Sequence, residues 1–230
     1  MKRRCEFTMI ELLVVVGIIA LLAGLVTPAV ISAQRQGRIT QAKSDMQSIL
    51  MALKGVEGAY GRMINVDSSN KVDFNGKKVT ASGTSPYKYV VFGGEDAEGD
   101  DTDKSSLAYD AMIAELTDPG NSGLSSRNVN KRKKVFLDPK SSYDPSAAYN
   151  SADNAKQLWL DPWGNRYRIF INSEGNVGIP NPAVNSKKLA VKAAVVSLGP
   201  NGVWDDAKNI DFPDEGSPTG DADDIASWRN

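Results

Sequence analysis

The side chains best suited to chemistry in this sequence are carboxylates, and they are concentrated near the C-terminus. The interval 205–224 contains eight acidic residues against one base, Lys208. The acidic residues are Asp205, Asp206, Asp211, Asp214, Glu215, Asp221, Asp223 and Asp224. Most acidic runs are solvated loops, but glycines and prolines interrupt this one, and Ile225 and Trp228 follow it as candidate core anchors. An ordered acidic loop needs a counter-charge. Calcium suits it, because Ca²⁺ takes roughly 6–8 oxygen ligands, although the EF-hand spacing is absent.

Histidine is missing from the sequence, and cysteine is almost absent. The 230-residue chain contains no histidine and one cysteine, Cys5. This composition excludes Ser-His-Asp and Cys-His catalysis, histidine metal sites and any intramolecular disulfide. The adjacent pair Asp223 and Asp224 could support acid–base chemistry, but no recognisable nucleophile accompanies it. We therefore expect that the chain is not an enzyme.

The charge distribution gives little reason to expect nucleic-acid binding. The formal net charge is −1, and the basic cluster at 130–134 is short and better interpreted as a solvated surface. Residues 1–6 are basic, with a net charge of +2 from Lys2, Arg3, Arg4 and Glu6, and removing them would leave −3. The chain therefore carries its positive excess immediately before its most apolar segment.

That apolar segment is long enough to cross a membrane. Residues 12–33 are 22 residues without a formal charge, and as a helix they would span about 33 Å against a hydrocarbon core of about 30 Å. The positive-inside rule places residues 1–6 in the cytoplasm and the chain after about residue 34 outside. A cleaved signal peptide and a plain membrane anchor are simpler interpretations. Neither explains Glu11, a carboxylate where the apolar region begins.

Residues 7–16, FTMIELLVVV, and the apolar run that follows as far as Pro28 resemble the N-terminus of type IV pilins and type II secretion pseudopilins. The resemblance implies that prepilin peptidase cuts between Glu6 and Phe7 and then N-methylates Phe7. The family has Gly where this chain has Glu6. The resemblance also implies that Glu11, the fifth residue of the mature chain, serves filament assembly. We expect its carboxylate to offset the burial of the Phe7 amine, its own or that of a neighbouring subunit.

Beyond the membrane segment, the pattern predicts a helix that continues to about residue 60. Apolar residues recur at spacings of three and four, which marks one helix face. They are Ile39, Ala42, Met46, Ile49, Leu53 and Val56. Pro28 favours a kink, and in the pilin family this region can unwind within filaments. The middle of the chain predicts a hairpin over 71–80, a strand over 87–94 and a short helix over 105–116.

The C-terminal part of the chain also resembles this family. The motifs DPWGNRYR (161–168), SLGPNG (197–202) and DDIASW (223–228) are similar to those of the major pseudopilin of type II secretion systems. The resemblance implies a calcium site formed by the Leu198 carbonyl, Asn201, Asp221 and Asp224, with Asp223 as a further candidate. Asn201 replaces the usual Asp, and whether Asp205 or Asp206 substitutes for the lost charge is left open. The segment 166–172 alternates as a strand, and the segment 192–202 is interpreted as a second strand that enters a tight turn.

We therefore expect an α+β, pilin-like fold, in which a long N-terminal helix packs on a small antiparallel sheet. The expected parts are a leader (1–6), a transmembrane and polymerisation helix (7–33), its amphipathic half (34–60), an inserted variable region (61–157) and a C-terminal sheet with an acidic calcium loop (158–230).

The resemblance implies a structural subunit of a type II secretion pseudopilus that drives protein export. It would be anchored once in the inner membrane, with a cytoplasmic N-terminus and a periplasmic C-terminal domain. Its implied partners are other copies of itself, minor pseudopilins, prepilin peptidase and the inner-membrane assembly platform, with no nucleic acid required. Two alternatives are a type IV pilin for adhesion, motility or DNA uptake, and an anchored monomeric binding domain.

Overall fold

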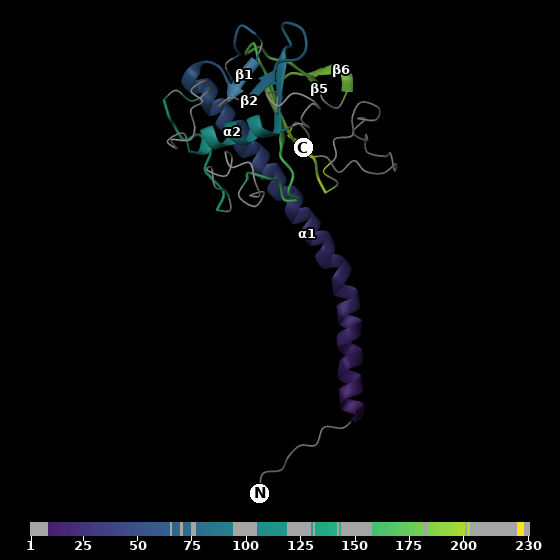
Figure 1. Ribbon diagram of the computed structural model, residues 1–230. Coiled ribbons are helices and arrows are strands. Elements are labelled where there is room, and N and C mark those ends of the chain that lie inside the picture. The colour runs from purple at the N-terminus through teal and green to yellow at the C-terminus, as the bar shows by residue number, and fades with distance from the viewer. Residues whose placement is uncertain are drawn as a thin grey trace. The chain divides into compact units, whose positions relative to one another are not determined.

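The computed structural model describes residues 9–64, 66–69, 71–74, 77–93, 105–118, 130, 132–141, 143, 158–181, 184–200, 202 and 225–227 (Figure 1). The chain divides into two units, residues 1–40 and residues 41–230. In chain order the elements are α1 (Met9–Tyr60), β1 (Lys71–Phe74), β2 (Lys77–Thr80), β3 (Tyr89–Phe92), α2 (Ser105–Thr117), β4 (Arg168–Asn172), β5 (Ile179–Asn181), β6 (Val184–Leu189), β7 (Ala193–Ser197) and β8 (Ile225–Ala226).

The predicted continuous N-terminal helix is confirmed, because α1 runs without a break from Met9 to Tyr60. It passes through Pro28, which has no N–H to donate to the carbonyl four residues earlier. One residue before the proline, the Thr27 hydroxyl donates to the Ala23 carbonyl at 2.7 Å, a local bond typical of hydroxyl residues inside helices.

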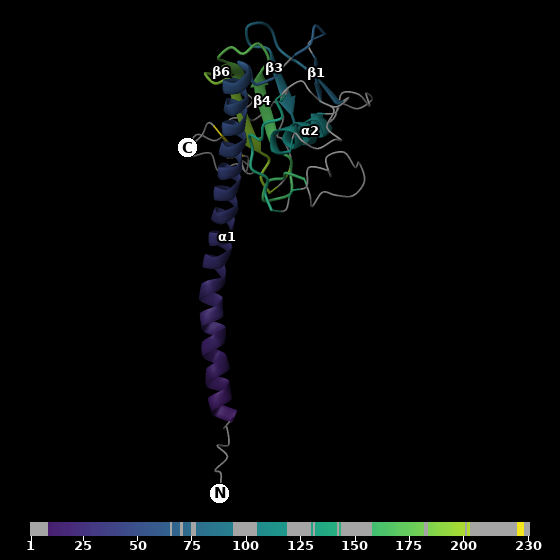
Figure 2. The same ribbon diagram turned by 90° about the vertical axis from the view of Figure 1, so that its left-hand side faces the viewer.

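Antiparallel pairing builds the central sheet of the second unit, in the order β3-β4-β7-β8. Val90 of β3 pairs with Ile171 of β4, and Ile169 of β4 pairs with Val195 of β7. Figure 2 gives a second view of the sheet strands beside the C-terminal part of α1. The small antiparallel sheet expected from the sequence is therefore present.

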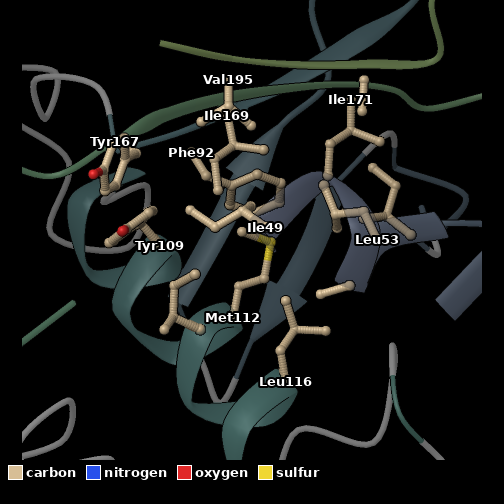
Figure 3. Close-up of a cluster of buried hydrophobic side chains, with 14 of the residues drawn as sticks. Ile49, Leu53, Phe92, Tyr109, Met112, Leu116, Tyr167, Ile169, Ile171 and Val195 are labelled. Carbon is tan, nitrogen blue, oxygen red and sulfur yellow. The ribbon is translucent and has the colours of Figure 1, made fainter. Parts of the chain in front are cut away.

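One face of this sheet is covered by helices. The α1 stripe predicted from the sequence is buried from Ala42 to Val56, and Ile39 is half-buried. Figure 3 shows Ile49 and Leu53 of α1 together with Tyr109, Met112 and Leu116 of α2, against Phe92, Ile169, Ile171 and Val195 of the sheet. Burial of such large apolar side chains, each worth roughly 1.5–3 kcal/mol, is the main force that holds both helices to the strands.

The other face of the sheet has its own smaller cluster. Phe170 of β4 and Val196 of β7 point to this side and join Ile179 of β5 and Ala226 of β8. Leu189 of β6 packs against the same cluster. Successive side chains of a strand point to opposite faces, so β4 and β7 contribute residues to both clusters. Both faces of these strands are therefore buried, which explains why their sequences are almost continuously apolar.

The middle of the chain contributes directly to this core. The hairpin, the strand and the helix predicted there correspond to β1–β2, β3 and α2, whereas the β5–β6 ribbon was not predicted. Gly93 follows β3 at a φ of 79°, and a Cβ there would lie 2.1 Å from the Tyr167 carbonyl oxygen. Only glycine permits this contact between the middle of the chain and the segment that leads into β4.

Candidate functional site

The first half of α1 presents an apolar surface on all sides. Glu11 lies in its first turn, where the partial positive charge of a helix N-terminus favours a carboxylate. Among the described residues, the exposed large apolar side chains are concentrated between Met9 and Ile31. The segment is long and apolar enough to cross a membrane. A helix that is apolar all round and uncovered by its own chain must be covered by lipid or by other helices.

The turn at 161–165 is organised by one buried carboxylate. Asp161 Oδ1 accepts hydrogen bonds from the backbone N–H groups of Trp163 and Asn165, at 3.0 and 2.8 Å. The Asp161 N–H in turn donates to the Asn165 carbonyl at 2.8 Å. The turn is closed by Gly164 at a φ of 98°. The predicted turn is confirmed, and its aspartate acts as its hydrogen-bonding centre.

Two side-chain bonds join this turn to the end of β7. The Ser197 hydroxyl donates to Asp161 Oδ2 at 2.7 Å, and Asn165 Nδ2 donates to the Gly199 carbonyl at 2.8 Å. Gly202 has no room for a side chain, since a Cβ would lie 2.8 Å from Asn165 Oδ1. The motif at 161–165 and the motif at 197–202 therefore form one connected structure.

One of the predicted calcium ligands, Leu198, lies in the described part of this structure. Leu198 follows β7 directly and is buried, with 8% of its surface exposed. The β7–β8 register pairs Ser197 with Ile225, which follows Asp224 in the chain. The remaining site predictions fall outside the described residues: Glu6, Phe7, Asn201, Asp221, Asp223 and Asp224. Within the described part of the chain, no group of three or more acidic residues is placed to hold a metal ion.

A second polar cluster fastens α1 to the rest of its unit. Asp45 Oδ2 accepts a hydrogen bond from Lys140 Nζ at 2.5 Å and one from the Tyr167 hydroxyl at 2.9 Å. Lys140 Nζ also donates to the Leu160 carbonyl at 2.9 Å and lies 4.8 Å from the centre of the Trp159 ring. Burial and the nearby Asp45 carboxylate raise the pKa of Tyr167 far above its usual range, so it remains a hydrogen-bond donor.

A third cluster orients α2 against β4. Arg166 donates to both carboxylate oxygens of Asp110, at 2.9 and 2.7 Å, and the Asp110 side chain is 3% exposed. One residue earlier on α2, the Tyr109 hydroxyl donates to the Trp159 carbonyl at 2.7 Å. Bidentate geometry and additional hydrogen bonds are what make a buried ion pair tolerable.

The segment 130–137 fastens the C-terminal ends of both helices. The Leu116 carbonyl of α2 accepts from the N–H groups of Phe136 and Leu137, at 2.9 and 3.1 Å. At the end of α1, the Tyr60 hydroxyl donates to Asn130 Oδ1 and accepts from the Arg132 N–H, each at 2.8 Å. Of the basic cluster predicted to be a solvated surface, Arg132, Lys133 and Lys134 are exposed, and they lie near two helix C-termini whose partial negative charge favours cations.

The position of the 161–165 turn could be predicted from the sequence, whereas the partners of its aspartate and the Asp45 and Asp110 clusters could not. A local signal existed for Asp45, a carboxylate between the stripe residues Ala42 and Met46. None existed for its partner Lys140, which is 95 residues away.

Comparison with known proteins relates part of the chain to a secretion protein. Over 55 residues it is 47% identical to the type II secretion system core protein G of Pseudomonas aeruginosa. The match covers 23% of this chain and 39% of the length of that relative. No family model matches the chain, and no solved structure shows significant similarity to it.

The similarity agrees with the α+β architecture of the chain, which is consistent with a pilin-like fold. Its long N-terminal helix carries an exposed apolar half, and its second half packs on a small antiparallel sheet. This arrangement fits anchoring in the inner membrane and a role linked to a secretion pseudopilus.

Proposed function

We propose that the chain is a structural subunit of a type II secretion pseudopilus that assembles through its N-terminal helix to drive protein export. The observation that carries this proposal is the 47% identity to a secretion core protein, in a chain whose α1 begins with an exposed apolar half headed by Glu11. In a filament, parallel packing of these helices would cover the apolar surface that the single chain leaves open.

Processing would create a positive charge with which the Glu11 carboxylate could pair. Cleavage by prepilin peptidase between Glu6 and Phe7, followed by N-methylation, leaves a cationic amine on Phe7. Burying that amine in a filament core costs several kcal/mol unless a carboxylate pairs with it. Glu11, four residues further along the chain, supplies the opposite charge to its own amine or to that of a neighbouring subunit.

The remaining partners follow from the same proposal. The chain would cross the inner membrane once, with its N-terminus in the cytoplasm and the chain after about residue 34 in the periplasm. It would contact minor pseudopilins, the assembly platform and prepilin peptidase, and it requires no nucleic acid. Pro28 would let part of the helix unwind during assembly, because it already lacks one backbone hydrogen bond.

We also propose that the acidic loop binds calcium. The donor set is chemically suitable, because carboxylates, an amide and a carbonyl are the hard oxygen ligands that Ca²⁺ prefers. The pairing of Ser197 with Ile225 supports this site, because Leu198 follows Ser197 in the chain and Asp224 precedes Ile225. The residues that would hold the ion are the Leu198 carbonyl, Asn201, Asp221 and Asp224, with Asp223 in addition. The ion would supply the positive charge that lets this acidic segment order without a disulfide.

Cross-linking in membranes tests assembly. Cells expressing the chain should give ladder-like oligomers with a membrane-permeant cross-linker, and Glu11→Ala should abolish the ladder while leaving the amount of anchored protein unchanged. Asp138→Ala, at an exposed site in the other unit, is the matched control and should assemble normally. Ladders of equal length from Glu11→Ala and wild type would exclude the assembly role of Glu11. A complete lack of oligomers in wild type would exclude the filament.

A further inference from the structure

Two exposed arginines follow the apolar run of the first unit. Arg35 and Arg38 lie on α1 three residues apart, so their side chains leave the same side of the helix. No acidic residue occurs anywhere between Glu11 and Asp45, so no carboxylate lies within a helical turn of either arginine. Among the ion pairs of the described residues, none includes Arg35 or Arg38. The helix itself therefore supplies no anion for the two guanidinium groups.

Their place along the chain puts the arginines at the surface of a bilayer that residues 12–33 would cross. Arg35 is two residues and Arg38 five residues past the end of that run, which is about 3 Å and about 7.5 Å farther along the helix axis. Each headgroup layer is about 5–7.5 Å thick, because a bilayer measures about 40–45 Å with its headgroups and about 30 Å without them. Arg35 would therefore lie within the headgroup layer and Arg38 at its outer edge.

Phosphate is the anion that suits this pair at that depth. The guanidinium group is planar, is more weakly hydrated than an ammonium group, and matches phosphate oxygens with two parallel N–H donors. Two cations on one side of a helix repel each other, and a shared or neighbouring phosphate would relieve that repulsion. A lipid of net negative charge would bind more strongly than phosphatidylcholine, whose own cation neutralises its phosphate.

We propose that Arg35 and Arg38 bind the phosphate groups of anionic phospholipids in the leaflet at the C-terminal end of the apolar run. This inference rests on the proposed function, because it requires α1 to cross the membrane. It assigns a lipid-binding site to two residues that filament assembly through the apolar surface leaves unused. Such contacts would fix the depth of the unassembled subunit in the bilayer.

The charges of α1 favour lipid over a second copy of this helix as the partner. The carboxylates of α1 are Glu11, Asp45 and Glu57. Asp45 and Glu57 already form ion pairs with residues of the second unit, and Glu11 lies at the opposite end of the apolar run. A neighbouring α1 therefore offers these arginines no carboxylate at their own level, whereas a bilayer surface supplies phosphates there.

Local photo-cross-linking identifies the lipids beside the two arginines. The full chain carries Gln36→p-benzoylphenylalanine, at an exposed position between them. It is reconstituted into vesicles that contain equal amounts of phosphatidylcholine and phosphatidylglycerol. Mass spectrometry then gives the ratio of phosphatidylglycerol to phosphatidylcholine adducts at residue 36. The basic residues of segment 1–6 lie at the other end of the apolar run, so they do not contribute to this local ratio.

We expect a ratio well above one when both arginines are present. Arg35→Gln and Arg38→Gln should each lower the ratio about fivefold, the effect of one basic residue at an anionic surface. The double variant should bring the ratio to about one. Lys43→Gln is the matched control, because it removes one exposed cation of α1 ten residues past the run, and it should leave the ratio unchanged.

A ratio of about one with both arginines present would overturn the inference, as would an equal loss from Lys43→Gln and Arg35→Gln. Adducts to a second copy of the chain in place of lipid adducts would also overturn it. Extraction with alkaline carbonate tests the membrane crossing separately, and the full chain should stay in the vesicle membrane. Release of the chain by carbonate would overturn the proposed crossing and this inference together, whereas retention with a ratio of about one overturns this inference alone.

Discussion

The Ser197 hydroxyl donates a 2.7 Å hydrogen bond to Asp161 Oδ2, and this bond joins two turns that lie 36 residues apart in the sequence. Both residues are buried, Ser197 completely and Asp161 to 6% exposure. The same carboxylate holds its own turn through the N–H groups of Trp163 and Asn165. Asp161 is therefore the residue through which the turn before β4 and the turn after β7 support each other.

Replacing Asp161 should destabilise the second unit strongly. Asp161→Ala leaves three donors without their acceptor, at a cost of about 3 kcal/mol in the free energy of unfolding. Asp161→Asn keeps one acceptor oxygen and should cost less, because the Ser197 hydroxyl can rotate to accept from the new amide. Urea unfolding of the full chain in detergent, followed by tryptophan fluorescence, measures both. Asp138→Ala should behave as wild type, and an Asp161→Ala midpoint equal to that of the control would refute the role assigned here.

Replacing Asp45 should loosen the junction between α1 and the segment that leads into β4. Asp45→Ala removes the acceptor of Lys140 and Tyr167 and should lower stability by about 2 kcal/mol. Hydrogen exchange should rise in α1 around residues 41–48 and change little at β7. Lys43→Ala, two residues away and exposed, is the matched control. Uniform exchange changes across the unit would mean that Asp45 does not act locally.

Glu115 should make stability depend on pH. Burial raises the pKa of Glu115 to about 7, against an opposing effect of Lys133. The folded chain therefore holds this proton more tightly than the unfolded chain, whose carboxyl has its ordinary pKa of 4.5. The contribution of Glu115 is complete below pH 4.5 and is lost as the pH rises through 7, a total of about 3 kcal/mol.

Glu115→Gln tests this linkage directly. The variant cannot ionise at this site, so its stability should fall less than that of wild type between pH 5 and about pH 8. Urea midpoints measured across that interval give the comparison, with Asp138→Asn as an exposed control. Parallel pH profiles for Glu115→Gln and wild type would contradict the buried, proton-holding state.

Removing calcium should destabilise the second unit. A ligand at about 100 times its Kd stabilises the folded state by about 2.7 kcal/mol, which for a unit of this size raises Tm by about 5–10 °C. We expect EGTA to lower Tm by that amount and Asp224→Ala to lose the response. Asp138→Ala should retain the response to EGTA. A wild-type Tm that changes with neither calcium nor EGTA would rule out the site.

How much the sequence could predict depended on the range of the interactions. The α1 helix and its stripe from Ala42 to Val56 follow from local periodicity, and both are confirmed. The strand order and the β5–β6 ribbon depend on long-range pairing and on the second core around Phe170, for which no local pattern exists. In the same way, the turn around Asp161 could be predicted, whereas its bond to Ser197 could not.

The central claim is that this chain is processed and assembled as a pseudopilin, and mass spectrometry of its mature N-terminus tests that claim most directly. The account predicts that the protein purified from membranes lacks residues 1–6 and begins with N-methylated Phe7, although Glu6 precedes the cut. A chain that keeps Met1 and carries an unmodified Phe7 would contradict it, because no new amine would then exist for Glu11 to pair with.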